Sequence, residues 1–148
     1  MAASIRLNRP NPHMRQAYSK KASGSLAAAK LLLEHELFAE AIALAYYAMY
    51  HKTTALFWSI GLRCKSHRKT TIILQQVFSI DPAPLEEARE QRISRQYYAD
   101  ITATAMDTAS LIDTAVSYLA TMDALMDSMN EEGRDACRKK AQLLADSG

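Results

Sequence analysis

Glycine and proline are scarce in this chain, whose 148 residues include only 4 of each. Because these residue types mark turns, their scarcity argues against a protein of many short strands and favours helices. No apolar run reaches the roughly 20 residues that a membrane-spanning helix needs. The run at 41–50 ends at His51 and Lys52, and the first residues contain no apolar stretch of the secretory type. We therefore expect a soluble, cytoplasmic protein with no membrane segment.

Cysteine is also rare, and its spacing does not suggest a metal site. Cys64 and Cys137 lie far apart without the paired spacing of zinc sites, and no two histidines are one helical turn apart. The scattered glycines do not form a phosphate-binding loop. We expect two free thiols and no metal or other cofactor.

Neither sign of charge dominates the whole chain, because 18 Lys and Arg residues stand against 16 Asp and Glu residues. The net charge of +2 gives no global field that would attract a nucleic acid. A local basic cluster nevertheless consists of Arg63, Lys65, His67, Arg68 and Lys69. The cluster indicates either an anion-binding surface or simply a solvated loop and helix start.

Apolar residues at helical spacing are what this chain has in abundance. They predict helices over about 13–35, 38–60, 66–78, 84–98 and 102–129. Gly61 suits the end of the second helix, and Ser66 suits the N-cap of the third. Long helices joined by short connections predict an all-α fold, an up-and-down bundle of four to five helices.

The same pattern predicts one domain with two flanking segments. Residues 1–12 form an extended lead-in with two prolines, 13–130 form the bundle, and 131–148 form a polar C-terminal helix or tail. Residues 41–50 are apolar or aromatic on every side, which is typical of a central helix or of one that lies against a second subunit. We therefore expect a homodimer.

The run Tyr-Tyr-Ala-Met-Tyr-His at 46–51 places aromatic hydroxyls and an imidazole in this helix. Side chains three to four residues apart share a helix face, so one row is predicted to contain Tyr47, His51, Thr54 and Trp58. A lone histidine on such a helix is usually a hydrogen-bonded group of the core or an interface, and a functional site is the alternative interpretation of His51.

These motifs resemble the HEPN domain family. The Tyr-Tyr-Ala-Met-Tyr-His run, followed by Gly61 and by Lys-Ser-His at 65–67, is similar to small archaeal and bacterial members that are often encoded beside a minimal nucleotidyltransferase. The segment 92–97 extends the resemblance, although Gln96 replaces the acid that is usual there. The resemblance covers roughly residues 13–128 and implies the same helical bundle.

The resemblance also defines which catalytic motif to look for. Catalytic HEPN proteins cleave RNA without a metal, with an Arg and a His about four to six residues apart on a helix. The candidates here, Arg63 and His67, have three residues between them and a predicted helix boundary. We therefore expect a binding or interaction module. One alternative is a metal-independent ribonuclease toxin that uses this pair, or His67 with Arg92, and another is a structural dimer without a ligand.

The leading hypothesis is one polar pocket for a nucleotide, a phosphate or RNA. Its predicted lining consists of Tyr47, His51, Lys65, His67, Arg92 and Tyr97. Lys65 and Arg92 would bind phosphate, and the tyrosines would stack on a base or form a hydrogen bond with it. The resemblance further implies a nucleotidyltransferase partner in a toxin-antitoxin or related defence or stress system. Such a partner would modify Tyr97 or Tyr98 with nucleotides.

Overall fold

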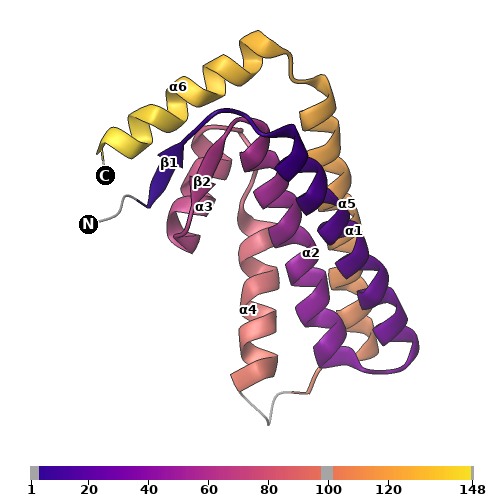
Figure 1. The fold of residues 1–148 in the computed structure, drawn as a ribbon. Helices are drawn as coiled ribbons and strands as arrows, with labels where there is room; N and C mark the ends of the chain where they lie inside the picture. The colour runs from indigo at the N-terminus through magenta and orange to yellow at the C-terminus, as the bar shows by residue number, and fades with distance from the viewer. Residues whose placement is uncertain (1–3, 98–101, 148) are drawn as a thin grey trace.

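Helices make up most of this protein (Figure 1). The computed structural model describes residues 4–97 and 102–147, apart from the side chains at positions 96 and 97. In chain order, the elements in these ranges are β1 (Ile5–Leu7), α1 (Pro12–Glu34), α2 (Phe38–Ser59), β2 (Leu62–Cys64), α3 (His67–Gln76), α4 (Ala83–Tyr97), α5 (Ala105–Ser128) and α6 (Glu131–Ser147). The predicted all-α bundle is confirmed, and the periodicity did not reveal the two short strands.

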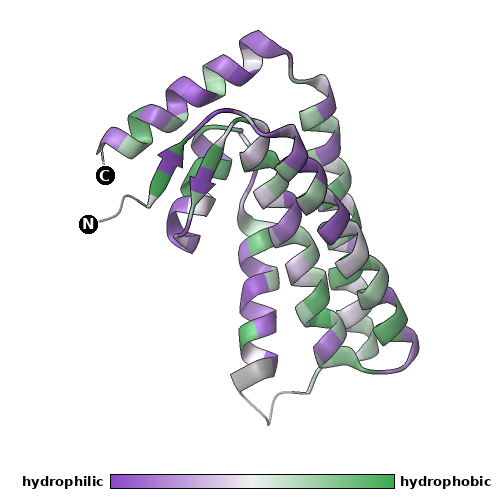
Figure 2. Cartoon of the chain, viewed as in Figure 1, coloured by the Kyte–Doolittle hydropathy of each residue, from purple (hydrophilic) through white to green (hydrophobic). Residues whose placement is uncertain are grey.

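The bundle is built around α2, which packs against α1, α4 and α5. Figure 2 shows hydrophobic residues concentrated where α1, α2 and α5 face one another, whereas α4 and α6 are hydrophilic over much of their length. In Figure 1, α6 crosses one end of the bundle beside the strands. Among the described helices, none combines the length and the apolar content that crossing a bilayer would require.

Two polar contacts join α2 to α5. The buried Lys52 Nζ lies 2.7 Å from Asp123 Oδ1. On the next residue, the buried Thr53 hydroxyl lies 2.6 Å from the Tyr118 hydroxyl. Because buried polar groups are costly without partners, these two pairs fix the rotation of α2 about its own axis.

Local signals explain where the helices begin and end. Ser66 accepts a hydrogen bond from Lys69 N, as expected for the cap of α3. Asn11 caps α1 in the same way, so α1 begins at Pro12 rather than at residue 13. Proline is tolerated at the first helical position because the missing N–H has no intrahelical partner there.

The N-terminal segment is tied to the end of α2. β1 pairs antiparallel with β2, which places Ile5 opposite Cys64 and Leu7 opposite Leu62. Gly61 adopts a φ of +74° between α2 and β2, and its carbonyl accepts a hydrogen bond from Asn8 N at 2.8 Å. An added Cβ at Gly61 would lie only 2.2 Å from Asn8 O. Only glycine fits this close approach of two backbone segments.

Replacing Gly61 by alanine should therefore lower the free energy of unfolding by about 3 kcal/mol or more, because it combines an unfavourable φ with a backbone clash. Gly24→Ala is the matched control. Gly24 lies inside α1 with nothing within 4 Å of an added Cβ, so alanine should stabilise the protein there by about 0.5–1 kcal/mol. Urea unfolding followed by circular dichroism measures both. Equal effects of the two substitutions would contradict this account.

Candidate functional site

A stripe of α2 remains uncovered between its neighbouring helices. Tyr47 and Tyr50 are 37% and 39% exposed, and His51, Thr54 and Trp58 are partly exposed. The Tyr47 and His51 rings stack with centroids 6.3 Å apart and an angle of 25°. The helical spacing therefore forms a row, but the row is an accessible surface rather than buried core. We call Tyr47, Tyr50 and His51, together with the buried Tyr46 beside them, the aromatic row.

Arg92 of α4 lies on the aromatic row. Its guanidinium carbon is 5.3 Å from the centre of the Tyr46 ring and 5.5 Å from that of Tyr47. The Nη1 atom also donates a hydrogen bond to the Tyr47 hydroxyl at 3.4 Å. The flat guanidinium is thus held against the faces of two rings, an arrangement favoured by the negative potential of those faces.

His51 is surrounded by aromatic rings and one lysine. Its ring centroid lies 6.0 Å from that of Tyr18 and 6.0 Å from that of Tyr50. Burial and, to a smaller extent, the positive charge of Lys21 lower the pKa of His51 below its ordinary value. Its buried Nδ1 atom has no hydrogen-bond partner within the part of the chain that the structure describes. The imidazole is therefore neutral at pH 7, with its Nδ1 atom closed off from solvent.

His67 belongs to a different part of the surface, where α3 begins. Burial lowers the pKa of His67, Arg89 of α4 lowers it further, and Glu86 opposes this change. Arg63 lies in β2, and Ser66 caps α3 between the two residues. The predicted helix boundary is confirmed, so Arg63 and His67 do not share a helix face. The basic group whose charge acts on His67 is Arg89, from a separate helix.

Lys65 lies in a separate hollow at the other end of the α2 stripe. That hollow has a volume of about 200 Å³ and is lined by Tyr18, Tyr50, Thr54, Phe57, Trp58, Leu62, Arg63, Cys64 and Lys65. The structure thus brings Tyr47, His51 and Arg92 together and places Lys65 and His67 elsewhere. The single pocket expected from the sequence is divided over three neighbouring places.

The remaining candidate tyrosines are at the end of α4. Tyr97 is the last residue of that helix, and its side chain is outside the described part of the structure. Tyr98 lies outside the described residues altogether. Their proposed modification stays a prediction.

Three residues at these places were missed by the sequence reasoning. Tyr18 and Lys21 come from α1, and Lys21 Nζ lies 5.4 Å from the centre of the Tyr18 ring. Arg89 precedes Arg92 by three residues, so the two guanidinium groups project from one side of α4. The repeated arginine spacing could have identified Arg89, whereas no local pattern reveals that α1 contacts His51.

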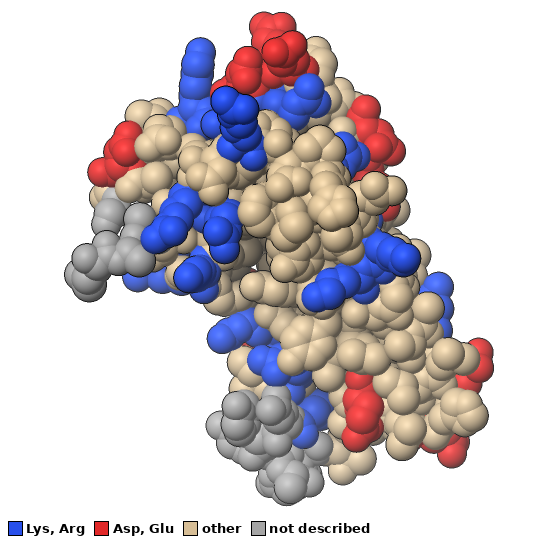
Figure 3. Space-filling model, viewed as in Figure 1, with Lys and Arg blue, Asp and Glu red and all other residues tan. Residues whose placement is uncertain are grey.

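Basic side chains border the aromatic row at both ends. Figure 3 shows Lys and Arg atoms gathered over α4, beside the grey atoms, and over the two strands, with a surface of other residues between them. The residues concerned include Arg89, Arg92 and Arg95 on α4 and Arg63 on β2. An accessible aromatic surface bordered by cations can bind planar groups that carry negative charge.

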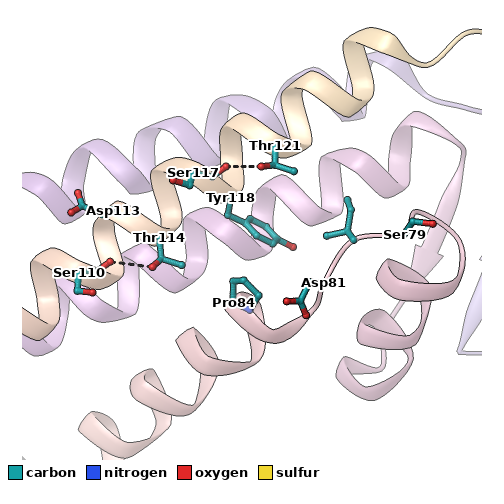
Figure 4. Close-up of a pocket in the computed structure, with 10 residues that line it drawn as sticks. Ser79, Asp81, Pro84, Ser110, Asp113, Thr114, Ser117, Tyr118 and Thr121 are labelled. Atoms are coloured by element: carbon teal, nitrogen blue, oxygen red, sulfur yellow. Dashed lines mark hydrogen bonds between the residues drawn. The ribbon is translucent and has the colours of Figure 1, made fainter.

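A hollow beside α5 has the wrong charge for that role. It measures about 580 Å³, between α5 and the segment before α4 (Figure 4). It is lined by Ser79, Ile80, Asp81, Pro84, Ser110, Asp113, Thr114, Ser117, Tyr118 and Thr121. Its only charged groups are the two carboxylates, which repel phosphate.

A third hollow, of about 510 Å³, contains four arginines: Arg9, Arg15, Arg134 and Arg138. Three of them are already engaged. Arg15 pairs with Asp127 at 3.4 Å, Arg134 donates a hydrogen bond to Met129 O, and Arg138 donates to Asn8 O and to the Ile60 carbonyl. Glu131 and Asp135 also line this hollow. Its arginines mainly hold α6 and the N-terminal segment in place.

Comparison with known proteins places these features in a family context. The family model for the HEPN domain matches residues 16–131, which include helices α2 to α5 and most of α1. A protein of Methanocaldococcus jannaschii that is named a putative toxin is 33% identical over 82 residues. This similarity covers 55% of the chain and 60% of the length of that relative.

The two perturbed histidines provide a test of the site geometry. Both have a lowered pKa, so below about pH 6.5 the unfolded chain binds more protons than the native protein, and the free energy of unfolding should fall as the pH decreases. In an NMR titration of the ring protons, Lys21→Gln should raise the pKa of His51 and leave that of His67 unchanged. Arg89→Gln should raise the pKa of His67 and leave that of His51 unchanged, so each variant serves as the control for the other. A common shift of both histidines would contradict the geometry described.

Proposed function

The chain belongs to the HEPN domain family, and we propose that it is a toxin-like member that binds a nucleotide or single-stranded RNA at the aromatic row. The family assignment rests on the match over residues 16–131. The toxin-like role is supported by the relative that is named a putative toxin. The ligand is inferred from the chemistry of the site.

The position of Arg92 is the observation that carries the ligand proposal. Its guanidinium is stacked on two rings and is hydrogen-bonded to Tyr47, so less rotational freedom is lost when it binds an anion. Guanidinium groups bind phosphate through two parallel hydrogen bonds. The neighbouring Tyr47 and Tyr50 rings are more than a third exposed and can stack on a base.

His51 adds a polar contact within the same site. The His51 ring is partly exposed, but its Nδ1 atom is buried, so a ligand would reach the neutral imidazole through Nε2. A base edge or a ribose hydroxyl would form a hydrogen bond with this nitrogen. Phosphate binding by Arg92, stacking on the tyrosines and a hydrogen bond to His51 are together what recognition of a nucleotide requires.

We further propose that the protein acts as a homodimer and is controlled by a nucleotidyltransferase-type partner. A toxin-like protein requires a means of restraint, and the family resemblance supplies this kind of partner. Exposed apolar side chains on the bundle include Leu31, Leu37, Met106 and Val116. Such residues are available for contact with another chain.

Ribonuclease activity is the second candidate, and the surroundings of His67 favour it. A neutral imidazole can act as a general base, and Arg89 could stabilise charge on a phosphate. This combination replaces the pairs Arg63 with His67 and Arg92 with His67 that the sequence suggested.

Adenosine monophosphate should raise the melting temperature of the wild-type protein, because a ligand specific for the native state stabilises it. Arg92→Gln should weaken the binding about tenfold or more, through the loss of a charge-assisted interaction. Arg15→Gln removes the same charge from a pair with Asp127 of α5 and should leave the affinity within about twofold, since this ion pair is exposed. No thermal shift at high ligand excess, or equal losses in both variants, would refute nucleotide binding at this site.

Incubation of total RNA with the protein in the presence of a chelator separates the two candidates. A binding module should leave the RNA intact, and His67→Ala should then behave as the wild type does. Cleavage without metal that is lost in His67→Ala and retained in His13→Ala would instead establish the ribonuclease.

A further inference from the structure

The hollow that contains Lys65 has the composition of a second binding place on the same face of the protein. Its residues come from α1, α2, β2 and the residue that follows β2. They include two cations, Arg63 and Lys65, and four aromatic rings, those of Tyr18, Tyr50, Phe57 and Trp58. Tyr50, Thr54 and Trp58 continue the stripe of α2 that begins at Tyr47. The hollow is therefore continuous with the aromatic row through Tyr50, which belongs to both.

The two strands concentrate positive charge beside this hollow. Antiparallel pairing places Arg6 directly opposite Arg63. Because Ile5 and Leu62 are buried and side chains alternate along a strand, both arginines project from the exposed side of the ribbon. Neither forms an ion pair with any residue in the ranges 4–97 and 102–147. Like charges directly across a strand pair are unfavourable, and an anion between them would relieve their repulsion.

Arg63 also links the cationic ribbon to the aromatic hollow. Its guanidinium carbon lies 5.6 Å from the centre of the Trp58 ring. Arg92 and Tyr47 are arranged in the same way at the other end of the stripe, where the distance is 5.5 Å. Each end of the exposed α2 stripe thus carries an arginine on an aromatic ring, and each can bind a phosphate beside a stacked base.

The separation of the two ends determines the size of the ligand. Trp58 follows Tyr47 by eleven residues, which corresponds to about 16 Å along a helix axis. One nucleotide cannot span that distance. A stacked single strand advances about 3.4 Å per nucleotide, so about five nucleotides fit between the two arginines.

We propose that Trp58, Arg63 and Lys65 form a second nucleotide subsite, and that the ligand is a single-stranded RNA of about five nucleotides along the exposed stripe of α2. This inference rests on the proposed function, because the first subsite is the aromatic row with Arg92. A second copy of the chain fits this end of the stripe poorly. Near a two-fold axis it would place the same cations opposite Arg6, Arg63 and Lys65.

Binding of oligoadenylates of one to eight nucleotides, measured by fluorescence anisotropy, tests the second subsite. The wild-type affinity should rise at least tenfold from one to about five nucleotides and then level off. In Arg63→Gln/Lys65→Gln the affinity for adenosine monophosphate should stay within twofold of the wild type, while the gain with length should fall below threefold. The slope of log K against log salt for the pentamer should become shallower by about 1.4, for two lost phosphate contacts.

Lys139→Gln/Lys140→Gln is the matched control, because it removes two exposed charges from α6. In this variant the affinity should rise with oligonucleotide length as much as it does in the wild type. Trp58 is the only tryptophan of the chain, so its fluorescence reports on the subsite without any substitution. The pentamer should quench this emission at concentrations at least tenfold lower than the monophosphate does, because binding at the aromatic row holds its far end at the subsite.

An affinity that does not increase with length, or equal losses in the two double variants, would overturn the second subsite. If adenosine monophosphate still binds and Arg92→Gln still removes that binding, the proposed function stands and only this inference fails. If neither the monophosphate nor the pentamer binds to the wild type, the proposed function itself is refuted.

Discussion

The rotational setting of α2 is the constraint on which the rest of the structure depends. Lys52 and Thr53 are buried and reach Asp123 and Tyr118 of α5, so the opposite side of the helix must face outward. Breaking such a contact leaves a buried charge or hydroxyl without a partner, which costs several kcal/mol for a fully buried charge and less here because Asp123 is half exposed. Because the contacts with α5 fix one face of α2, Tyr47 on the opposite face is exposed to solvent.

The outward face of α2 acquires its chemistry from its neighbours. α4 supplies Arg92, α1 supplies Tyr18 and Lys21, and β2 supplies Arg63. A nearly balanced chain can thus have a strongly basic local surface, because acidic residues are placed on other faces, such as those at the hollow beside α5. Net charge describes the whole field of a protein and says little about one face of it.

Much of the helical architecture could be read directly from the sequence. Gly61 ends α2 with a left-handed residue, Ser66 caps α3, and the apolar spacing of α5 gives its buried stripe. These signals are local, since each depends on residues within one or two turns. The strands were not predicted, because pairing of Ile5 with Cys64 depends on two three-residue segments that are far apart in the sequence.

For the candidate site, the sequence by itself determined which residues of α2 share a row and which family the chain resembles. Only the tertiary structure decided that Arg92 lies on that row, that the charge of Arg89 acts on His67, and that Lys65 lies in a separate hollow. The physical reason is that helical periodicity fixes neighbours within one helix, whereas contacts between helices depend on how their faces pack together.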